Sequence, residues 1–403
     1  MVLLTREEEE ILEGKMGEAK ARALEAIVKV AESLGAERLI RIEHAHISGV
    51  SYGTIGEPGR RFIEDLYLSG ARVSVPTTVN PIGFDDADPA NTGGILKVDK
   101  DFLEGQQAII RALTGMGANP VLTCTPYKTR SFASLNLKPG SHVAWGESSA
   151  VAYANTVLGI WTNREGGPLA LLASIAGRTY YYGVHIPENR IPSETYRVEI
   201  APVDEVDAGV VAEILAETHD NDRPPLVEMG LPPEPYRDIV LREFSAALGA
   251  AGNISMAVIP GITPVETRGM RPGPAIEIEA RLIISRRKDL APGNPVDFIF
   301  LGCPHLAADD LKILDHYLNG KARIPIIATL SRDAYERAGD HIRRLQAKGV
   351  RFIRSTCLIV GQLKSRDYSI ATNSYKAYFY LRRKVSSVGL LSLPALARLA
   401  VNP

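Results

Sequence analysis

Three cysteines are the residues of this 403-residue sequence with the widest range of chemistry, and they lie far apart. None of Cys124, Cys303 and Cys357 has a second cysteine within a few residues, so the sequence shows no C-x-x-C pair of the kind that most zinc sites contain. Each could be a packed small hydrophobe, a nucleophile, half of a disulfide or a metal ligand. Taken singly, each is best interpreted as a core residue.

The three cysteines share a position relative to the predicted strands. Each comes at or near the end of an apolar pattern, in 119–124, 296–303 and 350–357, and each pattern follows a predicted helix. This alternation predicts parallel strands, whose carboxyl ends meet at one sheet edge, where ligands gather. Three converging thiolates without a fourth protein ligand suit a [4Fe-4S] cluster with one open, Lewis-acidic iron better than zinc. The residues alone leave core packing and cluster binding both open.

Two loops after other predicted strands could bind an anionic substrate. Gly49, Val50 and Ser51 can present backbone N–H groups to a carboxylate or phosphate, although a plain turn is the simpler interpretation on spacing alone. Asn80 precedes Pro81 and is therefore held in an extended conformation, as a turn residue or as a hydrogen-bond donor to substrate. We expect the donor.

A helix of small residues is predicted over 147–160, and its first residues could take part in proton transfer. By default Ser148 is an N-cap and Glu147 an exposed residue of the first turn. Beside a metal centre, the same Ser148 hydroxyl could meet an anionic substrate, and Glu147 could accept or relay the proton of a leaving hydroxyl group.

Other charged residues and histidines have structural interpretations of equal simplicity. Arg164 could clamp a phosphate with two hydrogen bonds or pair with the glutamate that follows it. Lys376 lies in an aromatic stretch, where a lysine usually extends over apolar surface. His44 and His46 alternate on one predicted strand, which favours a structural role. His305 follows a cysteine closely and is expected to support a ligand rather than to be one.

The composition excludes several functional classes. The chain has 46 basic and 47 acidic residues and a net charge of −1, which gives no electrostatic argument for binding nucleic acid or an anionic membrane. No apolar run approaches the ~20 residues of a membrane span. The acidic start is unlike a secretory signal, and three cysteines form no disulfide framework, so we expect a cytoplasmic protein with reduced thiols.

The alternation of helix and strand patterns predicts an α/β fold with mostly parallel sheets. We expect an N-terminal α/β region over 1–200, an inserted or middle α/β unit over 201–292 and a C-terminal α/β region over 293–403. Segments 253–260 and 275–285 of the middle unit are predicted as strands, and 37–49 as one strand running into a glycine loop.

Five motifs occur in order along the first half of the chain and together resemble the large subunit of the aconitase X family. They are "AHISGVSYGTIG" (45–56), "VPTTVNPIG" (75–83), "TCTPY" (123–127), "WGESSAVAYANTVLG" (145–159) and "TNREGGP" (162–168). The resemblance extends over essentially the whole chain. It implies aconitase-like α/β/α layers in several domains, with the active site between the domains. Ordinary aconitases bring two cluster cysteines from a C-x-x-C pair, which this sequence lacks.

The resemblance also implies an activity and residue roles. The family dehydrates (R)-5-phosphomevalonate to trans-anhydromevalonate 5-phosphate in a modified archaeal mevalonate pathway for isoprenoids, and a bacterial branch dehydrates cis-3-hydroxy-L-proline. The implied roles are cluster ligands at Cys124, Cys303 and Cys357, catalysis at Glu147 and Ser148, and substrate binding at Gly49, Val50, Ser51, Asn80, Pro81, Arg164 and Lys376.

A partner follows from the same resemblance. The family uses a swivelling domain that carries the catalytic serine, and this chain ends without one, so we expect a separate small subunit and no activity of the chain alone. Two alternatives stay open: cis-3-hydroxyproline as the substrate, and a non-enzymatic, metal-binding scaffold subunit. The roles of Tyr127, Lys128 and Arg130 also stay open.

Overall fold

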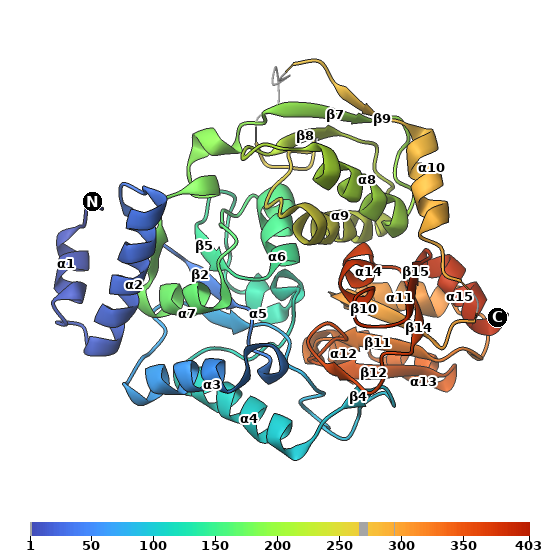
Figure 1. Ribbon diagram of the computed structural model, residues 1–403, viewed down its shortest axis with the longest axis horizontal. Coiled ribbons are helices and arrows are strands. Elements are labelled where there is room, and N and C mark those ends of the chain that lie inside the picture. The colour runs from blue at the N-terminus through green and yellow to red at the C-terminus, as the bar shows by residue number, and fades with distance from the viewer. Residues whose placement is uncertain (1, 266–272, 294) are drawn as a thin grey trace.

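Figure 1 shows the computed structural model, in which residues 2–265, 273–293 and 295–403 are described. Their sheets are mostly parallel, as the alternating sequence pattern predicts. Three sheets are entirely parallel, with strand orders β3-β2-β5, β8-β7-β9 and β12-β11-β10-β14-β15. Two short pairs, β1–β6 and β13–β4, are antiparallel. The boundaries proposed at 200 and 292 stay a prediction.

The first sheet contains β2 (His44–Ile47), β3 (Thr77–Val79) and β5 (Val143–Trp145). One face is apolar and packs in the N-terminal core with α2 and α7. The single strand predicted within 37–49 is two strands, because β1 (Leu39–Arg41) turns away to pair with β6 (Arg178–Tyr180). The helices of this part are α1 (Arg6–Leu12), α2 (Glu18–Leu34), α3 (Tyr52–Leu68), α4 (Lys100–Gly115), α5 (Arg130–Ala133), α6 (Ser148–Tyr153) with the π-helical η2 (Ala154–Leu158), and α7 (Gly167–Ala176). Short 3-10 turns are η1 (Pro126–Lys128), η3 (Gly183–His185) and η4 (Pro187–Arg190).

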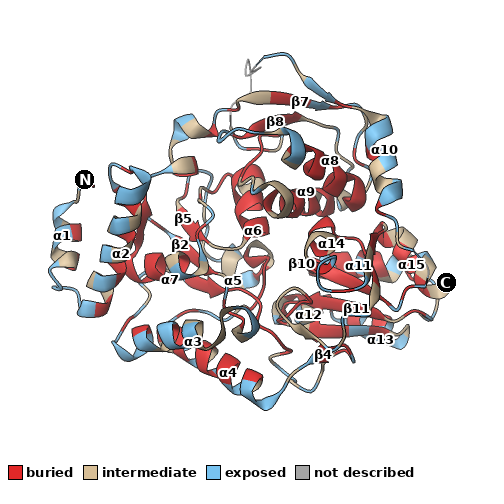
Figure 2. Ribbon diagram, viewed as in Figure 1, coloured by how far each residue is buried: buried red, intermediate tan, exposed pale blue. Residues whose placement is uncertain are grey.

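The middle sheet packs on two buried helices. It contains β7 (Glu194–Val198), β8 (Pro225–Glu228) and β9 (Ile276–Ile278), and its helices are α8 (Glu205–Thr218), α9 (Tyr236–Ala247) with the π-helical η5 (Leu248–Gly252), and α10 (Ala280–Asp289). Figure 2 shows α8 and α9 as largely buried and α10 as more exposed.

Both strand predictions in this unit are at least partly wrong. Segment 253–260 forms no regular strand and only an isolated bridge, Leu226 to Val258. Segment 275–285 is a strand for three residues and then becomes α10, because alternation of side chains cannot be distinguished from a helix over so few residues.

The five-stranded sheet forms the core of the C-terminal part. Its strands are β10 (Phe298–Leu306), β11 (Ile326–Leu330), β12 (Val350–Arg354), β14 (Ser369–Thr372) and β15 (Ser387–Leu390). The helices around it are α11 (Ala308–Tyr317), α12 (Arg332–Ala338), α13 (Asp340–Ala347), α14 (Tyr375–Leu381) and α15 (Leu393–Val401). The short pair β4 (Leu96–Lys97) and β13 (Gln362–Leu363) lies beside it. Alternate residues of its strands fill two separate apolar clusters, one on each face.

The cysteine-bearing strands differ in detail from the prediction. Segment 119–124 runs beside β3 without forming a strand, because Pro120 cannot donate to the ladder and Leu122 has a φ of 48°. The strand before Cys303 continues irregularly to Leu306. Cys357 comes three residues after β12, near the strand end as predicted.

Within the described part of the chain, every helix is too short or too polar to cross a membrane.

Candidate active site

The strand ends of the first and the C-terminal sheets meet at the centre of the molecule (Figure 1). The backbone N–H of Ile82, just past β3, donates to the carbonyl of Ser355 over 2.9 Å, and Ile82 bridges Thr356. The Ser51 hydroxyl donates to the carbonyl of Val360 over 2.9 Å. Segments about 300 residues apart in the sequence are therefore hydrogen-bonded to each other on both sides of Cys357.

All three cysteines are buried and are free thiols. Each follows a left-handed residue by one or two positions: Leu122 with φ 48°, Gly302 with φ 113° and Ser355 with φ 62°. A left-handed residue redirects the chain at a strand end, which turns the next side chains out of the sheet. At Gly302 a Cβ atom would lie 2.2 Å from the carbonyl oxygen of Thr329, so that position requires glycine.

The cysteines influence one another electrostatically. Burial raises the pKa of the Cys124 thiol, and the charges of Glu147 and Cys357 raise it further. Burial likewise raises the pKa of Cys303, opposed by Lys376 and reinforced by both other cysteines. Burial also raises the pKa of Cys357, opposed by backbone N–H groups of Val360 and Ile359. A bound metal would remove the thiol protons by supplying positive charge at this point.

His305 joins two of the cysteine segments. Its backbone N–H donates to the Sγ atom of Cys124 over 3.2 Å, and its ring Nε2 donates to the carbonyl of Thr356 over 2.9 Å. Its Nδ1 then accepts from the Thr123 hydroxyl at 3.1 Å. The histidine thus supports the cysteines and is not directed at a metal through its ring, as the sequence predicted.

The donor set fits a multi-iron cluster better than a single ion. No three His, Cys, Asp or Glu side chains in the described ranges are grouped to hold one metal ion. A cluster is bound by one cysteine per iron, so its ligands need not meet around one point. Three buried sulfurs, N–H donors to Cys124 and Cys357 and the nearby ammonium of Lys376 suit an anionic iron–sulfur group.

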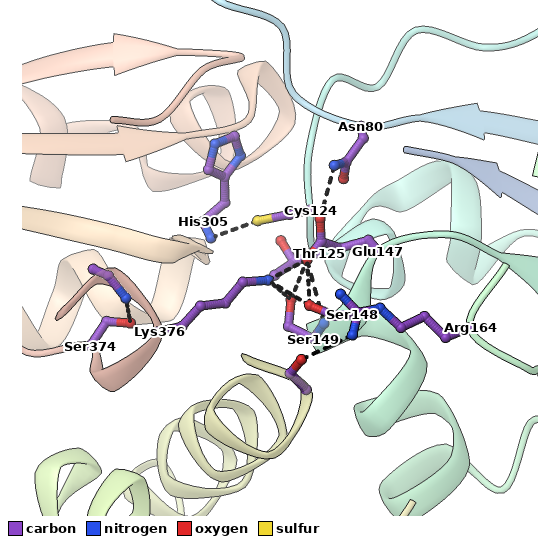
Figure 3. A network of polar contacts seen from close by, with 12 residues as sticks. Asn80, Cys124, Thr125, Glu147, Ser148, Ser149, Arg164, His305, Ser374 and Lys376 are labelled. Atoms are coloured by element: carbon purple, nitrogen blue, oxygen red, sulfur yellow. Dashed lines mark hydrogen bonds and ion pairs between the residues drawn. The ribbon is translucent and has the colours of Figure 1, made fainter. Parts of the chain in front are cut away.

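Lys376 and Glu147 form a buried ion pair beside the cysteines (Figure 3). Lys376 Nζ also donates to Ser148 Oγ over 3.1 Å and to Ser149 Oγ over 3.3 Å. An ammonium has three protons, so these partners account for all of its donors. The Ser148 hydroxyl accepts from Lys376, and its own donation to Glu147 Oε1 is long, 3.5 Å, so its proton can turn to a closer acceptor.

The pair determines the charge of Glu147. Burial alone would raise the pKa of the Glu147 carboxyl, but the charge and hydrogen bond of Lys376, with help from Asn80 and His46, lower it to about 2. Burial lowers the pKa of Lys376, and the Glu147 charge reverses this and raises it. Glu147 is therefore a fixed anion, and it caps α6 by accepting from the N–H of Ser149 at 3.4 Å. Ser148, the expected N-cap, does not cap the helix.

Asn80 lies on the other side of Glu147. Its amide Nδ2 donates to Glu147 Oε2 over 2.9 Å, and its Oδ1 faces His46 Nε2 at 3.1 Å. One amide proton remains for a further acceptor. Pro81 follows it, buried, and leads into the contact between Ile82 and Ser355.

The predicted loop at 49–51 is held on both sides. The side-chain Oε1 of Gln106 accepts a hydrogen bond from the backbone N–H of Tyr52, and its Nε2 donates to the carbonyl of Val50, each over 2.8 Å. Gly49 has a φ of 63° and lies against Gly167. The bond of Ser51 to Val360 attaches this loop to the segment that follows Cys357.

Arg164 approaches the network from the side opposite to Lys376 (Figure 3). Its guanidinium is exposed and donates to the carbonyl of Gly249 over 3.2 Å and to Asn253. The neighbouring Glu165 carboxylate does not pair with it but accepts from Thr179 at 2.9 Å and Tyr180 at 2.7 Å.

The residues after Cys124 attach its loop to other elements. Tyr127 stacks on Tyr153 with ring centroids 4.2 Å apart. Lys128 pairs with Asp238 over 2.6 Å, and Arg130 pairs with Asp333 and with Glu336 over 2.8 Å. These side chains hold the cysteine loop against α9 and α12.

The sequence interpretation missed two contributors to this site. Ser149 binds both Glu147, over 3.1 Å, and Lys376, and its position beside Ser148 was a signal that could have found it. The backbone N–H of His305 donates to Cys124, which no sequence pattern reveals.

Comparisons with known proteins agree with this architecture. Residues 1–188 match the family model of the aconitase X first domain, and residues 296–402 match that of the aconitase X third domain. The phosphomevalonate dehydratase large subunit of Aeropyrum pernix is 48% identical over 98% of this chain and 99% of its own. The cis-3-hydroxy-L-proline dehydratase of Pseudomonas aeruginosa is 32% identical over 86% of this chain and 60% of its own. The crystal structure of Thermococcus kodakaraensis aconitase X (holo-form) superposes with a TM-score of 0.87 at 35% identity, covering 99% of this chain and 100% of that one.

The mostly parallel α/β sheets and the superposition on an aconitase X structure define an aconitase-type fold. The chain belongs to the aconitase X family, as the five sequence motifs predicted. Membership of an aconitase-like family implies an iron–sulfur cluster.

Proposed function

We propose that this chain is the large subunit of a hydro-lyase that dehydrates (R)-5-phosphomevalonate to trans-anhydromevalonate 5-phosphate for isoprenoid synthesis. The observation that carries the proposal is the buried network of Lys376, Glu147 and Ser148 beside Cys124. The names of the relatives support the reaction: the large subunits from Aeropyrum pernix and Methanosarcina mazei are phosphomevalonate dehydratase chains, 48% and 35% identical to this one.

Cys124, Cys303 and Cys357 would hold a [4Fe-4S] cluster with one iron open. When bound, such a cluster supplies a Lewis acid that assists the loss of a substrate hydroxyl. The chain contributes a dry site, since all three cysteines are buried. Exclusion of water strengthens each electrostatic contact in the site.

Glu147 and Ser148 would act in proton transfer to the leaving hydroxyl. The Ser148 hydroxyl retains a proton, and Lys376 polarises it by donating to the same oxygen. Loss of the hydroxyl as water consumes one proton, and the Glu147 carboxyl, positioned by Lys376 and Asn80, would relay to the departing oxygen the proton that is removed from the carbon next to the carboxylate. Lys376 acts chiefly by orienting these two groups, because its donors are already engaged within the chain.

The substrate would be bound by the surrounding loops. The free amide proton of Asn80 and the backbone of Gly49, Val50 and Ser51 would donate to its carboxylate. Arg164 is exposed and can turn toward the phosphate, which a guanidinium binds with two hydrogen bonds. Pro81 would contribute by fixing the extended conformation of Asn80.

A small subunit is part of this proposal. The name "large subunit" of the relatives supports such a partner. It would carry the swivelling domain and the serine that removes the proton next to the carboxylate, so this chain alone would be inactive.

The test is an anaerobic assay of the reconstituted two-subunit enzyme with each of two substrates. We expect water loss from phosphomevalonate and none from cis-3-hydroxy-L-proline. Product from hydroxyproline alone would overturn the substrate assignment. A colourless complex without iron or labile sulfide would overturn the enzyme assignment in favour of a scaffold subunit.

A further inference from the structure

A chain of hydrogen-bonded side chains crosses the polar face of the first sheet toward the candidate active site. His46 of β2 is in register with Thr78 of β3 on one side and with Trp145 of β5 on the other. Side chains alternate along a strand, so His44 and Asn80, each two positions away, extend from the same face. The parallel register therefore places all five side chains in one layer.

These side chains are buried and form a continuous chain of contacts. In order, the distances are 2.9 Å from Trp145 Nε1 to His44 Nδ1, 3.3 Å from His44 Nε2 to Thr78 Oγ1, 2.8 Å from Thr78 Oγ1 to His46 Nδ1, 3.1 Å from His46 Nε2 to Asn80 Oδ1 and 2.9 Å from Asn80 Nδ2 to Glu147 Oε2. Figure 3 shows the last of these contacts.

Trp145 sets the donor–acceptor direction of the first two hydrogen bonds. An indole N–H can only donate, so the Nδ1 atom of His44 must accept from Trp145. Burial lowers the pKa of His44 to about 3, so its ring is neutral and carries its single proton on Nε2. The Nε2–H group then donates to the hydroxyl oxygen of Thr78.

The direction continues through the second histidine. The Thr78 hydroxyl has one proton, which it donates to Nδ1 of His46. Burial lowers the pKa of His46 to about 4 and outweighs the opposing effects of Asn80 and Glu147, so this ring is neutral as well. Its proton lies on Nε2 and is donated to the amide oxygen of Asn80.

The hydrogen bond from Asn80 to Glu147 follows from the orientation of the Asn80 amide. With its oxygen turned toward His46, the Asn80 amide must turn its NH2 group toward Glu147. The reversed amide would place a carbonyl oxygen against the carboxylate, where two acceptors repel and the buried carboxylate loses a donor. The direction of every bond thus follows from the indole at one end.

We propose that Trp145, His44, Thr78 and His46 are positioning residues that fix the amide of Asn80 and thereby hold the Glu147 carboxylate in its reactive orientation. The catalytic part of this inference rests on the proposed function. The direction of the hydrogen bonds is a property of the chain by itself.

The bond direction is tested by nitrogen NMR of the full-length chain with 15N-labelled histidine. Protonated and unprotonated ring nitrogens have distinct shifts, and His44→Gln and His46→Gln variants assign the two rings. We expect both rings to be neutral with the proton on Nε2. A proton on Nδ1 of either ring would overturn the proposal, whatever the enzyme does.

Thr78 offers a matched set of substitutions for the relay. Thr78→Val removes the hydroxyl at nearly constant volume, and Thr78→Ser keeps it. Thr77→Val is the control, because Thr77 is equally buried but bonds to the carbonyl of Val75 on the other face. We expect mixed tautomers of His46 in Thr78→Val only. An unchanged His46 spectrum in that variant would contradict the relay.

Kinetics of the reconstituted enzyme test the effect on Glu147. Thr78→Val is expected to lower kcat about 10- to 100-fold with little change in KM, the size of effect typical of groups that orient a reacting residue. Thr78→Ser should restore most of the loss, and Thr77→Val should match the wild type. Equal kcat values in all four proteins would overturn the positioning role. A wild-type enzyme without hydro-lyase activity would count against the proposed function and leave the tautomer result to decide the bond direction.

Discussion

The backbone N–H of His305 donates to the Sγ atom of Cys124 over 3.2 Å, although 181 positions separate the two residues. The bond joins the segment between α4 and η1 to the end of β10, and the ring of His305 continues the connection to Thr356, next to Cys357. One residue therefore links all three cysteine segments, since Cys303 is two positions before it.

Single substitution of each cysteine by serine should remove most of the bound iron. Anaerobically purified Cys124→Ser, Cys303→Ser and Cys357→Ser proteins would be compared with the wild type for iron and labile sulfide, because a cluster with one open iron has no spare protein ligand. Thr356→Ser, beside Cys357 but retaining its hydroxyl, should keep its iron. Undiminished iron in all three cysteine variants would contradict the ligand assignment.

Loss of the Lys376 charge should destabilise the chain strongly. Lys376→Met leaves the buried Glu147 anion without its cation, which costs about 3–5 kcal/mol for a buried pair. The control is Lys29→Met, which breaks an exposed pair with Glu25 and should leave stability nearly unchanged, because solvent screens that pair. Urea unfolding measures both values. A further Glu147→Gln change should recover part of the loss, and equal costs at both sites would refute the buried-pair argument.

Substitution by alanine should destabilise the chain at Gly167 but not at the adjacent Gly166. A Cβ atom on Gly167 would lie 2.3 Å from the carbonyl oxygen of Ser48, whereas a Cβ atom on Gly166 would have no neighbour closer than 4.0 Å. Gly167→Ala should therefore lower the free energy of unfolding by about 1–3 kcal/mol, and Gly166→Ala should change it by about 0.5 kcal/mol or less. Thermal unfolding distinguishes the two, and similar melting temperatures would show that the 48–51 loop can move away.

The buried carboxyl of Glu165 should make stability depend on pH. Burial raises its pKa to about 7, although Tyr180 and Thr179 donate to it. Between pH ~4.5 and ~7 the folded chain keeps a proton that the unfolded chain releases, so stability falls as pH rises through this window and is level above it. The shift corresponds to about 3 kcal/mol.

Urea unfolding at pH 5 and pH 7.5 measures this dependence. Glu165→Gln should reduce the difference between the two pH values by about 2 kcal/mol, leaving the share due to other buried carboxyls such as Glu205 and Glu243, whose pKa values burial also raises. Glu188→Gln, at an exposed site, should leave the difference unchanged. An identical pH profile in Glu165→Gln would mean that Glu165 is already ionised in the fold.

The sequence by itself determined the features that depend on neighbouring residues. The mostly parallel sheets follow from the alternation of local helix and strand patterns, and the structure confirms them. The five ordered motifs identified the family. The positions of the cysteines near strand ends also come from local apolar patterns, although segment 119–124 proved not to be a regular strand.

Only the tertiary structure decided how the distant residues act together. Lys376 meets Glu147 across 229 positions, and Arg164 donates to η5 and to Asn253 just after it rather than to Glu165. The line from Trp145 to Asn80 exists because three strands pair in one register, which no single segment specifies. The physical reason is that helix and turn preferences act over a few residues, whereas burial, ion pairing and the direction of hydrogen bonds depend on which surfaces the whole chain brings into contact.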